Sequence, residues 1–101
     1  MDIKTLEEKS EKVATILKAI GNEKRLMIVC LLSAGEKNVG ELEQLVGLSQ
    51  SALSQHLARL RRDDILATRR EAQTIYYSIK DKNVSALLDS LCTIYSAPTI
   101  A

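Results

Sequence analysis

The sequence predicts a mainly α-helical domain that carries one β-hairpin, which is an α+β fold. Up to Asp64, and again from Asp81 to Tyr95, apolar residues recur every three or four positions, which is the period of an α-helix. Between these parts the period changes to two, and β-branched residues and tyrosines become frequent, which is typical of paired strands. Because 101 residues is a usual size for one domain, we expect residues 1–101 to fold as a single unit.

Two helices are expected in the first third of the chain. The first spans residues 4–20, and we expect Gly21 to end it in the left-handed conformation. Asn22 can cap the second helix, whose centre is the uninterrupted apolar run from Leu26 to Leu32. That run has no period of its own. The Asn22 cap and the charged residues Glu23 to Arg25, which lie between the cap and the run, favour a central, buried helix over a strand. The apolar stripe of the first helix consists of Leu6, Val13, Ile16, Leu17 and Ile20.

A helix-turn-helix is predicted over residues 38–62. Asn38 and Glu41 have the spacing of a capping box, which starts a short helix that Gly47 ends. Ser49 can cap a second helix that continues to the end of this segment. Two short helices joined by a turn that contains glycine form a helix-turn-helix motif. In the first of these helices we expect the buried residues to be Val39, Leu42, Leu45 and Val46.

The second helix of this motif has two unlike faces. At about 100° per residue, Leu53, Leu57 and Leu60 fall on one side, which we expect to be buried. The opposite side begins with small and hydrogen-bonding groups, which suit base edges, and ends with guanidinium groups, which suit phosphates. This pattern predicts a DNA-recognition helix, and an ordinary amphipathic surface helix is the alternative. The opposite side consists of Ser51, Ser54, Gln55, Ala58, Arg61 and Arg62.

A β-hairpin is expected over residues 65–79, with Glu71 and Ala72 at its turn. The turn lacks the usual Asn-Gly pair, and Arg69 and Arg70 lie at its tip. A basic hairpin directly after a recognition helix is a wing. The elements then follow in the order ααααββα, which is a winged helix-turn-helix.

The last helix is expected over residues 81–95, and Pro98 follows it. Its apolar stripe and that of residues 4–20 together exceed what so small a domain easily buries. We therefore expect these two helices to form the surface of a homodimer, and the alternative is that they only cover the central helix. The stripe of the last helix consists of Val84, Leu87, Leu88, Leu91 and Tyr95.

The net charge of +1 conceals an uneven distribution. Residues 49–80 contain six Arg or Lys against three acidic residues, a net +3, whereas residues 1–48 and 81–101 each carry −1. A local positive charge suits a one-sided contact with nucleic acid. The chain contains no apolar run of membrane-spanning length and does not begin like a signal peptide, so we expect a cytoplasmic protein without a membrane partner.

Residues for catalysis or metal binding are scarce. His56 is the single histidine and has no acid or thiol at helical spacing, and no glycine-rich phosphate loop is present, so we expect no enzyme and no cofactor. Two cysteines and one histidine are too few for a closed metal site within one chain, and a site shared across a dimer is the alternative. From the residues alone, Cys30 and Cys92 fit reduced thiols that act as small core hydrophobes.

Three runs of sequence resemble the ArsR/SmtB family of winged-helix repressors. They are Asn38-Val39-Gly40-Glu41-Leu42, then G-L-S-Q-S-A-L-S-Q-H-L-A-R-L-R, then the hairpin A-T-R-R-E-A-Q-T-I-Y-Y-S-I. The resemblance extends from Glu8 to Tyr95. Within the family it is greatest to the subgroup that contains BigR, SqrR, HlyU and NolR, part of which senses sulfur species and oxidants.

This resemblance implies a role for the two cysteines. Cys30 in the second helix and Cys92 in the last would be oxidised by reactive sulfur species or peroxides, forming a disulfide or polysulfide bridge. The Cys-x-Cys of arsenic sensors has no counterpart here, because Val39 to Leu42 occupy its place, and the last helix lacks the ligands of zinc sensors. Some relatives have the DNA-binding motif without the thiol pair. The alternatives are therefore a constitutive or anti-silencing regulator with inert thiols, and a metal-responsive repressor.

The partner we expect is double-stranded DNA with an imperfect palindromic operator. A homodimer would place its recognition helices in successive major grooves, about 34–36 Å apart. Ser51, Ser54 and Gln55 are candidates for base contacts, and the arginines of the helix end and wing are candidates for phosphate or minor-groove contacts. The residues predicted to contact DNA are Gln50, Ser51, Ser54, Gln55, His56, Arg59, Arg61, Arg62, Arg69 and Arg70.

Overall fold

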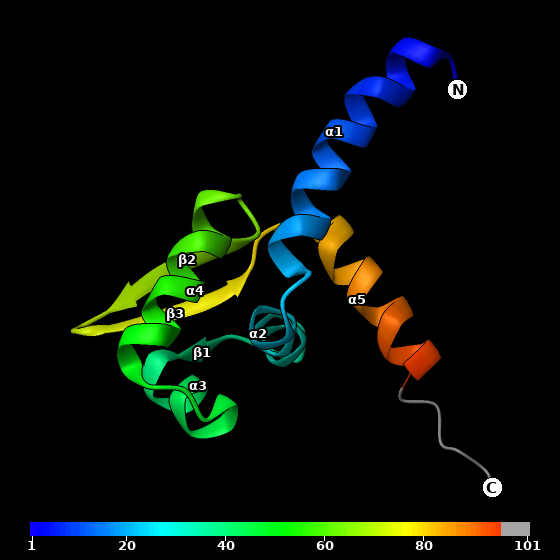
Figure 1. The fold of residues 1–101 in the computed structure, drawn as a ribbon. Coiled ribbons are helices and arrows are strands. Elements are labelled where there is room, and N and C mark those ends of the chain that lie inside the picture. Colours follow the sequence, from blue (N-terminus) through cyan, green and yellow to red (C-terminus); the bar gives the residue numbers. More distant parts are fainter. Residues whose placement is uncertain (96–101) are drawn as a thin grey trace, which may run out of the picture.

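A computed structural model describes residues 1–95 of the chain, and the expected Pro98 lies outside this range (Figure 1). The predicted winged helix-turn-helix is confirmed, with one additional short strand, β1, that the sequence did not predict. The elements of the described residues are α1 (Ile3–Ile20), α2 (Glu23–Ser33), β1 (Lys37–Asn38), α3 (Val39–Val46), α4 (Gln50–Arg62), β2 (Leu66–Glu71), β3 (Thr74–Ile79) and α5 (Lys82–Tyr95).

Side-chain caps start three of the helices at the residues that the sequence predicted. The Asn22 side chain accepts hydrogen bonds from two backbone N–H groups of α2, at 3.0 and 3.1 Å. Asn38 and Glu41 form the reciprocal capping box of α3, with N–O distances of 2.9 and 3.0 Å. Ser49 caps α4 by accepting from the N–H of Ala52 at 3.2 Å. These caps satisfy backbone donors that have no partner within the helix.

The two helix-ending glycines act for different reasons. Gly47 has φ 73° and ψ 28°, the left-handed conformation that favours glycine, as predicted. The same prediction is wrong for Gly21, which has φ −79° and ψ 37°. A Cβ atom on Gly21 would lie 2.8 Å from the backbone oxygen of Leu17, so glycine is needed there because of the close approach of the chain.

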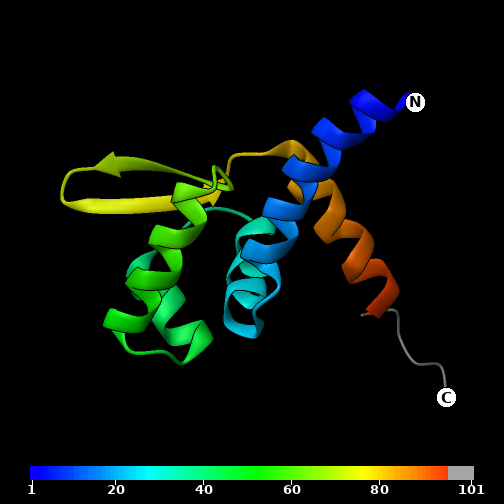
Figure 2. The same ribbon diagram turned by 45° about the horizontal axis from the view of Figure 1, so that its top comes forward.

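The core is centred on α2, which packs against α1, α3, α4, α5 and β3 (Figures 1 and 2). Its Ile28 and Val29 are fully buried, as expected for a helix that is apolar on nearly every side. The leucine stripe of α4, defined as Leu53, Leu57 and Leu60, is at most 1% exposed.

One core prediction for α3 is wrong. Leu42 and Val46 are buried, but Leu45 is 53% exposed. The helix is only eight residues long, and its contacts with α2, α4, β1 and β3 bury the side that carries Leu42 and Val46. A residue adjacent to that side therefore remains accessible to solvent.

The wing belongs to a three-stranded antiparallel sheet in the order β1-β3-β2. Arg69 pairs with Tyr76 and Arg70 with Ile75 across the hairpin. Strand β2 continues to Glu71, so the turn consists of residues 72–73 rather than the predicted 71–72. Ala72 adopts φ 56°, a left-handed conformation that glycine or asparagine usually occupies, which explains why the sequence did not locate this turn.

Helices α1 and α5 lie on the side of the domain away from the wing (Figures 1 and 2), and their outer parts carry exposed apolar side chains. The alternative that these helices only cover α2 holds for part of each helix: Ala19 and Ile20 of α1, and Val84 and Leu88 of α5, are buried. The large apolar residues that stay exposed on the two helices are Ile3 (77%), Leu6 (52%), Val13 (48%), Leu17 (49%), Ile94 (65%) and Tyr95 (82%).

We predict that Leu57→Ala lowers the free energy of unfolding by about 2–5 kcal/mol, because it removes a buried side chain and leaves a cavity. The measurement is urea denaturation followed by circular dichroism at one protein concentration. Leu45→Ala is the matched control. Because the Leu45 side chain is exposed, we expect this variant to change the free energy of unfolding by no more than about 0.5 kcal/mol. Equal losses in the two variants would contradict the assigned packing of α4.

Candidate nucleic-acid interface

Burial of the leucine stripe directs the opposite side of α4 outward. Seven residues on that side are exposed, whereas His56 and Arg59, at the border of the two faces, are half-buried. The start of the exposed side carries hydroxyl and amide groups, and its end carries guanidinium groups. The exposed residues are Gln50, Ser51, Ser54, Gln55, Ala58, Arg61 and Arg62.

The arginines at the end of α4 differ in their partners. Arg59 Nε donates to a carboxylate oxygen of Asp63 at 3.1 Å, one helical turn later. Arg61 and Arg62 are exposed and form no ion pair within residues 1–95. The free positive charge at this helix end therefore comes from Arg61 and Arg62, and it also interacts favourably with the helix dipole.

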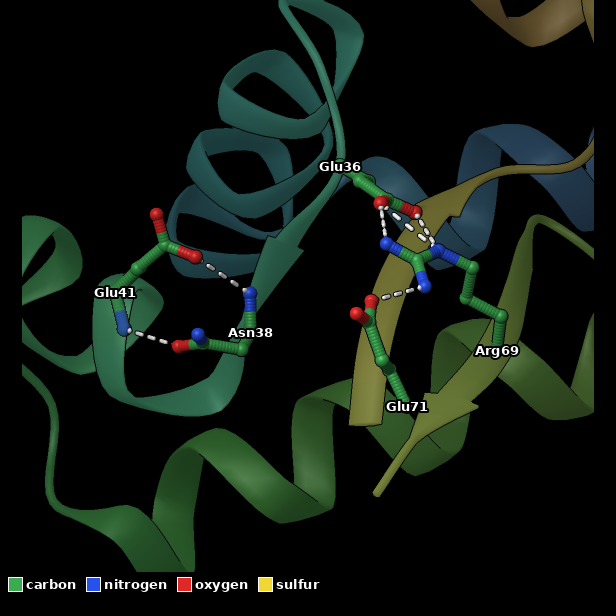
Figure 3. Close-up of polar contacts among 5 residues, drawn as sticks. All are labelled: Glu36, Asn38, Glu41, Arg69 and Glu71. Carbon is green, nitrogen blue, oxygen red and sulfur yellow. Dashed lines mark hydrogen bonds and ion pairs between the residues drawn. The ribbon is translucent and has the colours of Figure 1, made fainter. Parts of the chain in front are cut away.

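The two wing arginines are also unlike. The guanidinium group of Arg69 contacts the carboxylates of Glu36 and Glu71 (Figure 3). The hydrogen bonds from Arg69 hold the pKa of Glu36 below its ordinary value, so this carboxylate stays charged. Arg70 is exposed and has no ion-pair partner in the described part of the chain. The sequence contains no signal for Glu36, because it lies 33 positions before Arg69.

His56 of α4 lies within electrostatic range of Arg25, which connects α2 to the end of α1. Arg25 belongs to α2, and its guanidinium donates to the backbone oxygens of Lys18 and Ala19 at the end of α1. Burial lowers the pKa of His56, and the nearby charge of Arg25 lowers it further. The lowered pKa favours the neutral imidazole, whose contact with a phosphate is weaker than that of a charged one.

The two thiols lie side by side on different helices. Cys30 of α2 is half-buried and packs against the core, whereas Cys92 of α5 is exposed. Burial raises the pKa of Cys30, and the neighbouring Cys92 thiol raises it further. The interpretation of both residues as core hydrophobes is thus wrong for Cys92. Within residues 1–95, no group of three or more His, Cys, Asp or Glu residues is arranged to hold a metal ion.

The described residues contain no helix that is both long and apolar enough to cross a lipid bilayer. What they do contain is a helix-turn-helix with an outward polar face, followed by a hairpin with an exposed arginine. That arrangement defines a winged helix-turn-helix DNA-binding protein. The comparison with known proteins narrows the class to a family.

The chain belongs to the arsR family of bacterial regulatory proteins, whose family model matches residues 22–68. It is 47% identical over 95 residues to the transcriptional activator HlyU of Vibrio cholerae, a match that spans 94% of this chain and 88% of HlyU. The protein is therefore a transcriptional regulator. Its resemblance to the HlyU and BigR subgroup is confirmed.

Solved structures agree with this assignment. The structure of reduced HlyU from Vibrio cholerae matches with a TM-score of 0.88 at 47% identity, covering 92% of this chain and 98% of that one. The repressor BigR from Xylella fastidiosa matches with a TM-score of 0.85 at 40% identity, covering 94% and 97%. The homodimeric DNA-binding domain Mb0332 from Mycobacterium bovis matches with a TM-score of 0.80 at 26% identity, covering 95% and 88%.

We predict that the pKa of His56, measured by NMR titration, lies below 6.5 and rises in Arg25→Gln. His56 is the single histidine, so its imidazole signals are unambiguous. Because the folded-state pKa is lowered, this group's contribution to stability is complete above pH 6.5 and is lost as the pH falls through the folded-state pKa. Lys24→Gln is the control, with an unchanged pKa expected. An unchanged value in Arg25→Gln would place Arg25 too far from α4 to act on it.

Proposed function

We propose that this protein is a homodimeric, DNA-binding transcriptional repressor whose affinity for its operator falls when Cys30 and Cys92 are oxidised. The observation that carries the DNA-binding part is the exposed side of α4, polar and then basic, opposite the buried leucine stripe. The direction of regulation follows the relatives named as repressors. HlyU is named an activator, so anti-silencing is the competing form of the same activity.

The side chains of α4 divide between base and phosphate contacts. The amide of Gln55 can donate to and accept from the edge of an adenine, and the hydroxyls of Ser51 and Ser54 are short enough to allow close approach. Gln50 lies at the helix start, where backbone N–H groups favour a phosphate. Arg61, Arg62 and Arg70, which are free of ion pairs in residues 1–95, supply positive charge for the DNA backbone.

A second copy of the chain is the partner proposed for α1 and α5. Both helices lie on the side of the domain away from the wing and carry exposed apolar residues, so pairing through these helices would leave both recognition helices accessible. The similarity to a homodimeric DNA-binding domain supports a homodimer. Two-fold symmetry of the protein requires an imperfectly palindromic operator, with half-site centres about 34–36 Å apart.

Gln55→Ala is expected to relax base preference, whereas Arg61→Ala weakens binding to all duplexes. The two residues lie on the same exposed face of α4, so each variant is a control for the other. The measurement is selection from a random duplex library with reduced protein, followed by fluorescence anisotropy on the duplexes that wild type selects. Loss of a bidentate base contact costs about 1–3 kcal/mol of discrimination. If Gln55→Ala selects the wild-type sequences with wild-type affinity, another face of the domain contacts the bases.

The proposed switch is a covalent link between α2 and α5. With a peroxide, the Cys30 and Cys92 thiols give up two protons and two electrons, a disulfide forms, and the peroxide leaves as water. With an inorganic polysulfide, the two thiols are oxidised in the same way, any sulfur atoms inserted between them come from the polysulfide chain, and its reduced sulfur leaves as hydrosulfide. The bridge fixes α5 relative to the core, and α5 also belongs to the proposed dimer surface. The two recognition helices then fit the fixed spacing of the DNA grooves less well. The adjacency of the two thiols supports this proposal. The chain is also similar to HlyU, of which a structure in the reduced form is known.

Oxidation of the wild type by sodium tetrasulfide or hydrogen peroxide is expected to weaken operator binding roughly 5- to 150-fold, the usual range of allosteric coupling. Intact-mass measurement identifies the bridge, because a disulfide removes two hydrogen atoms and a polysulfide adds sulfur. Cys30→Ala and Cys92→Ala are expected to bind DNA with and without oxidant. A bridged wild type with unchanged affinity would favour the constitutive alternative, and release of the reduced wild type from DNA by zinc would favour the metal-responsive one.

A further inference from the structure

Arg69 and Arg70 are neighbours in the sequence but lie on opposite faces of the wing. Side chains alternate along a strand, and cross-strand partners share a face. Arg69 therefore shares its face with Glu71 and with Tyr76, its partner on β3. Arg70 shares the other face with its partner Ile75. The two guanidinium groups cannot have the same surroundings.

The guanidinium group of Arg69 contacts the carboxylates of Glu36 and Glu71 (Figure 3). Its Nε lies 2.9 Å from both carboxylate oxygens of Glu36, and one terminal nitrogen also contacts Glu36. The other terminal nitrogen lies 2.8 Å from Glu71. The central carbon of the group lies 4.5 Å from the centroid of the Tyr76 ring, which is a cation–π contact.

These contacts cross the whole width of the sheet. Arg69 is on β2, Tyr76 is on β3, and Glu36 directly precedes β1, in a sheet with the order β1-β3-β2. The end of β1, Asn38, pairs with Tyr76 and also caps α3. The Arg69 side chain thus connects the outer strand of the wing to the segment that begins the helix-turn-helix.

We infer that Arg69 is a positioning residue that sets the angle of the wing to the helix-turn-helix, and that the phosphate contact of this pair belongs to Arg70. The inference rests on the proposed DNA-binding function and goes beyond it by giving the two arginines different roles. Two carboxylates surround one guanidinium, so Arg69, Glu36 and Glu71 together present a negative charge rather than a positive one. A phosphate that approached Arg69 would meet the negative charge of these two carboxylates.

The test is the salt dependence of operator binding by reduced protein, measured by fluorescence anisotropy over a series of KCl concentrations. Arg70→Gln reduces the slope of log affinity against log salt by about one unit per protomer, because one phosphate contact is lost. Arg69→Gln weakens binding but leaves the slope at the wild-type value. Since the contacts are exposed, we expect a weakening of about two- to fivefold.

Glu36→Gln separates the two roles by the direction of its effect. If Arg69 positions the wing, the loss of the Glu36 charge loosens the wing and weakens DNA binding. If Arg69 contacts phosphate, the same change frees its positive charge and strengthens binding. The double variant with Arg69→Gln is expected to bind no more weakly than Arg69→Gln alone, because both remove the same contact.

Hydrogen exchange of the β2 and β3 amides in the DNA-free protein is the second readout. Arg69→Gln and Glu36→Gln are expected to exchange faster in these strands, and Arg70→Gln is expected to match the wild type. A reduced salt slope in Arg69→Gln, or stronger binding by Glu36→Gln, would overturn the inference. If the wild type binds no duplex, the proposed function fails. Unchanged hydrogen exchange of the β2 and β3 amides in Glu36→Gln and Arg69→Gln would separately overturn the positioning role of Arg69.

Discussion

The structure depends on the burial of one face of α4 against the rest of the core. Leu53, Leu57 and Leu60 are inaccessible to solvent, and the apolar helix α2 lies at the centre of the elements that enclose them. A helix with one face fixed in this way can neither rotate about its axis nor slide without exposing leucine to water. The opposite face is therefore presented in a single orientation, which sequence-specific contact with DNA requires.

A short stretch before α3 connects the helix-turn-helix to the wing. Asn38 ends β1, pairs with Tyr76 of β3 and provides the side-chain cap of α3. Glu36, two residues earlier, contacts Arg69 of β2. Residues 36–38 thus provide backbone pairing, a helix cap and an ion pair. The helix-turn-helix and the wing, the two parts of the candidate DNA interface, are thereby joined by contacts that are present before DNA binds.

The other side of the domain has a different chemistry. There α1 and α5 expose apolar residues, and the Cys30–Cys92 pair lies where α5 meets α2. Because α2 packs against α5 and also against α3 and α4, the proposed bridge would join a helix of the dimer surface to the helix that the DNA-binding elements share. The proposed switch thus requires no long chain of contacts between the thiols and the recognition helices.

The sequence by itself determined the helices, the side-chain caps of α2, α3 and α4, the hairpin and the family, because these depend on the local period, on short-range hydrogen bonds and on motif spacing. It also indicated the polar face of α4 and the two cysteines. Tertiary structure alone decided that Cys92 is exposed while Cys30 is half-buried, that Leu45 is accessible and that Glu36 meets Arg69. Those outcomes depend on which distant elements pack together, and β1, with two residues, is too short to show a period at all.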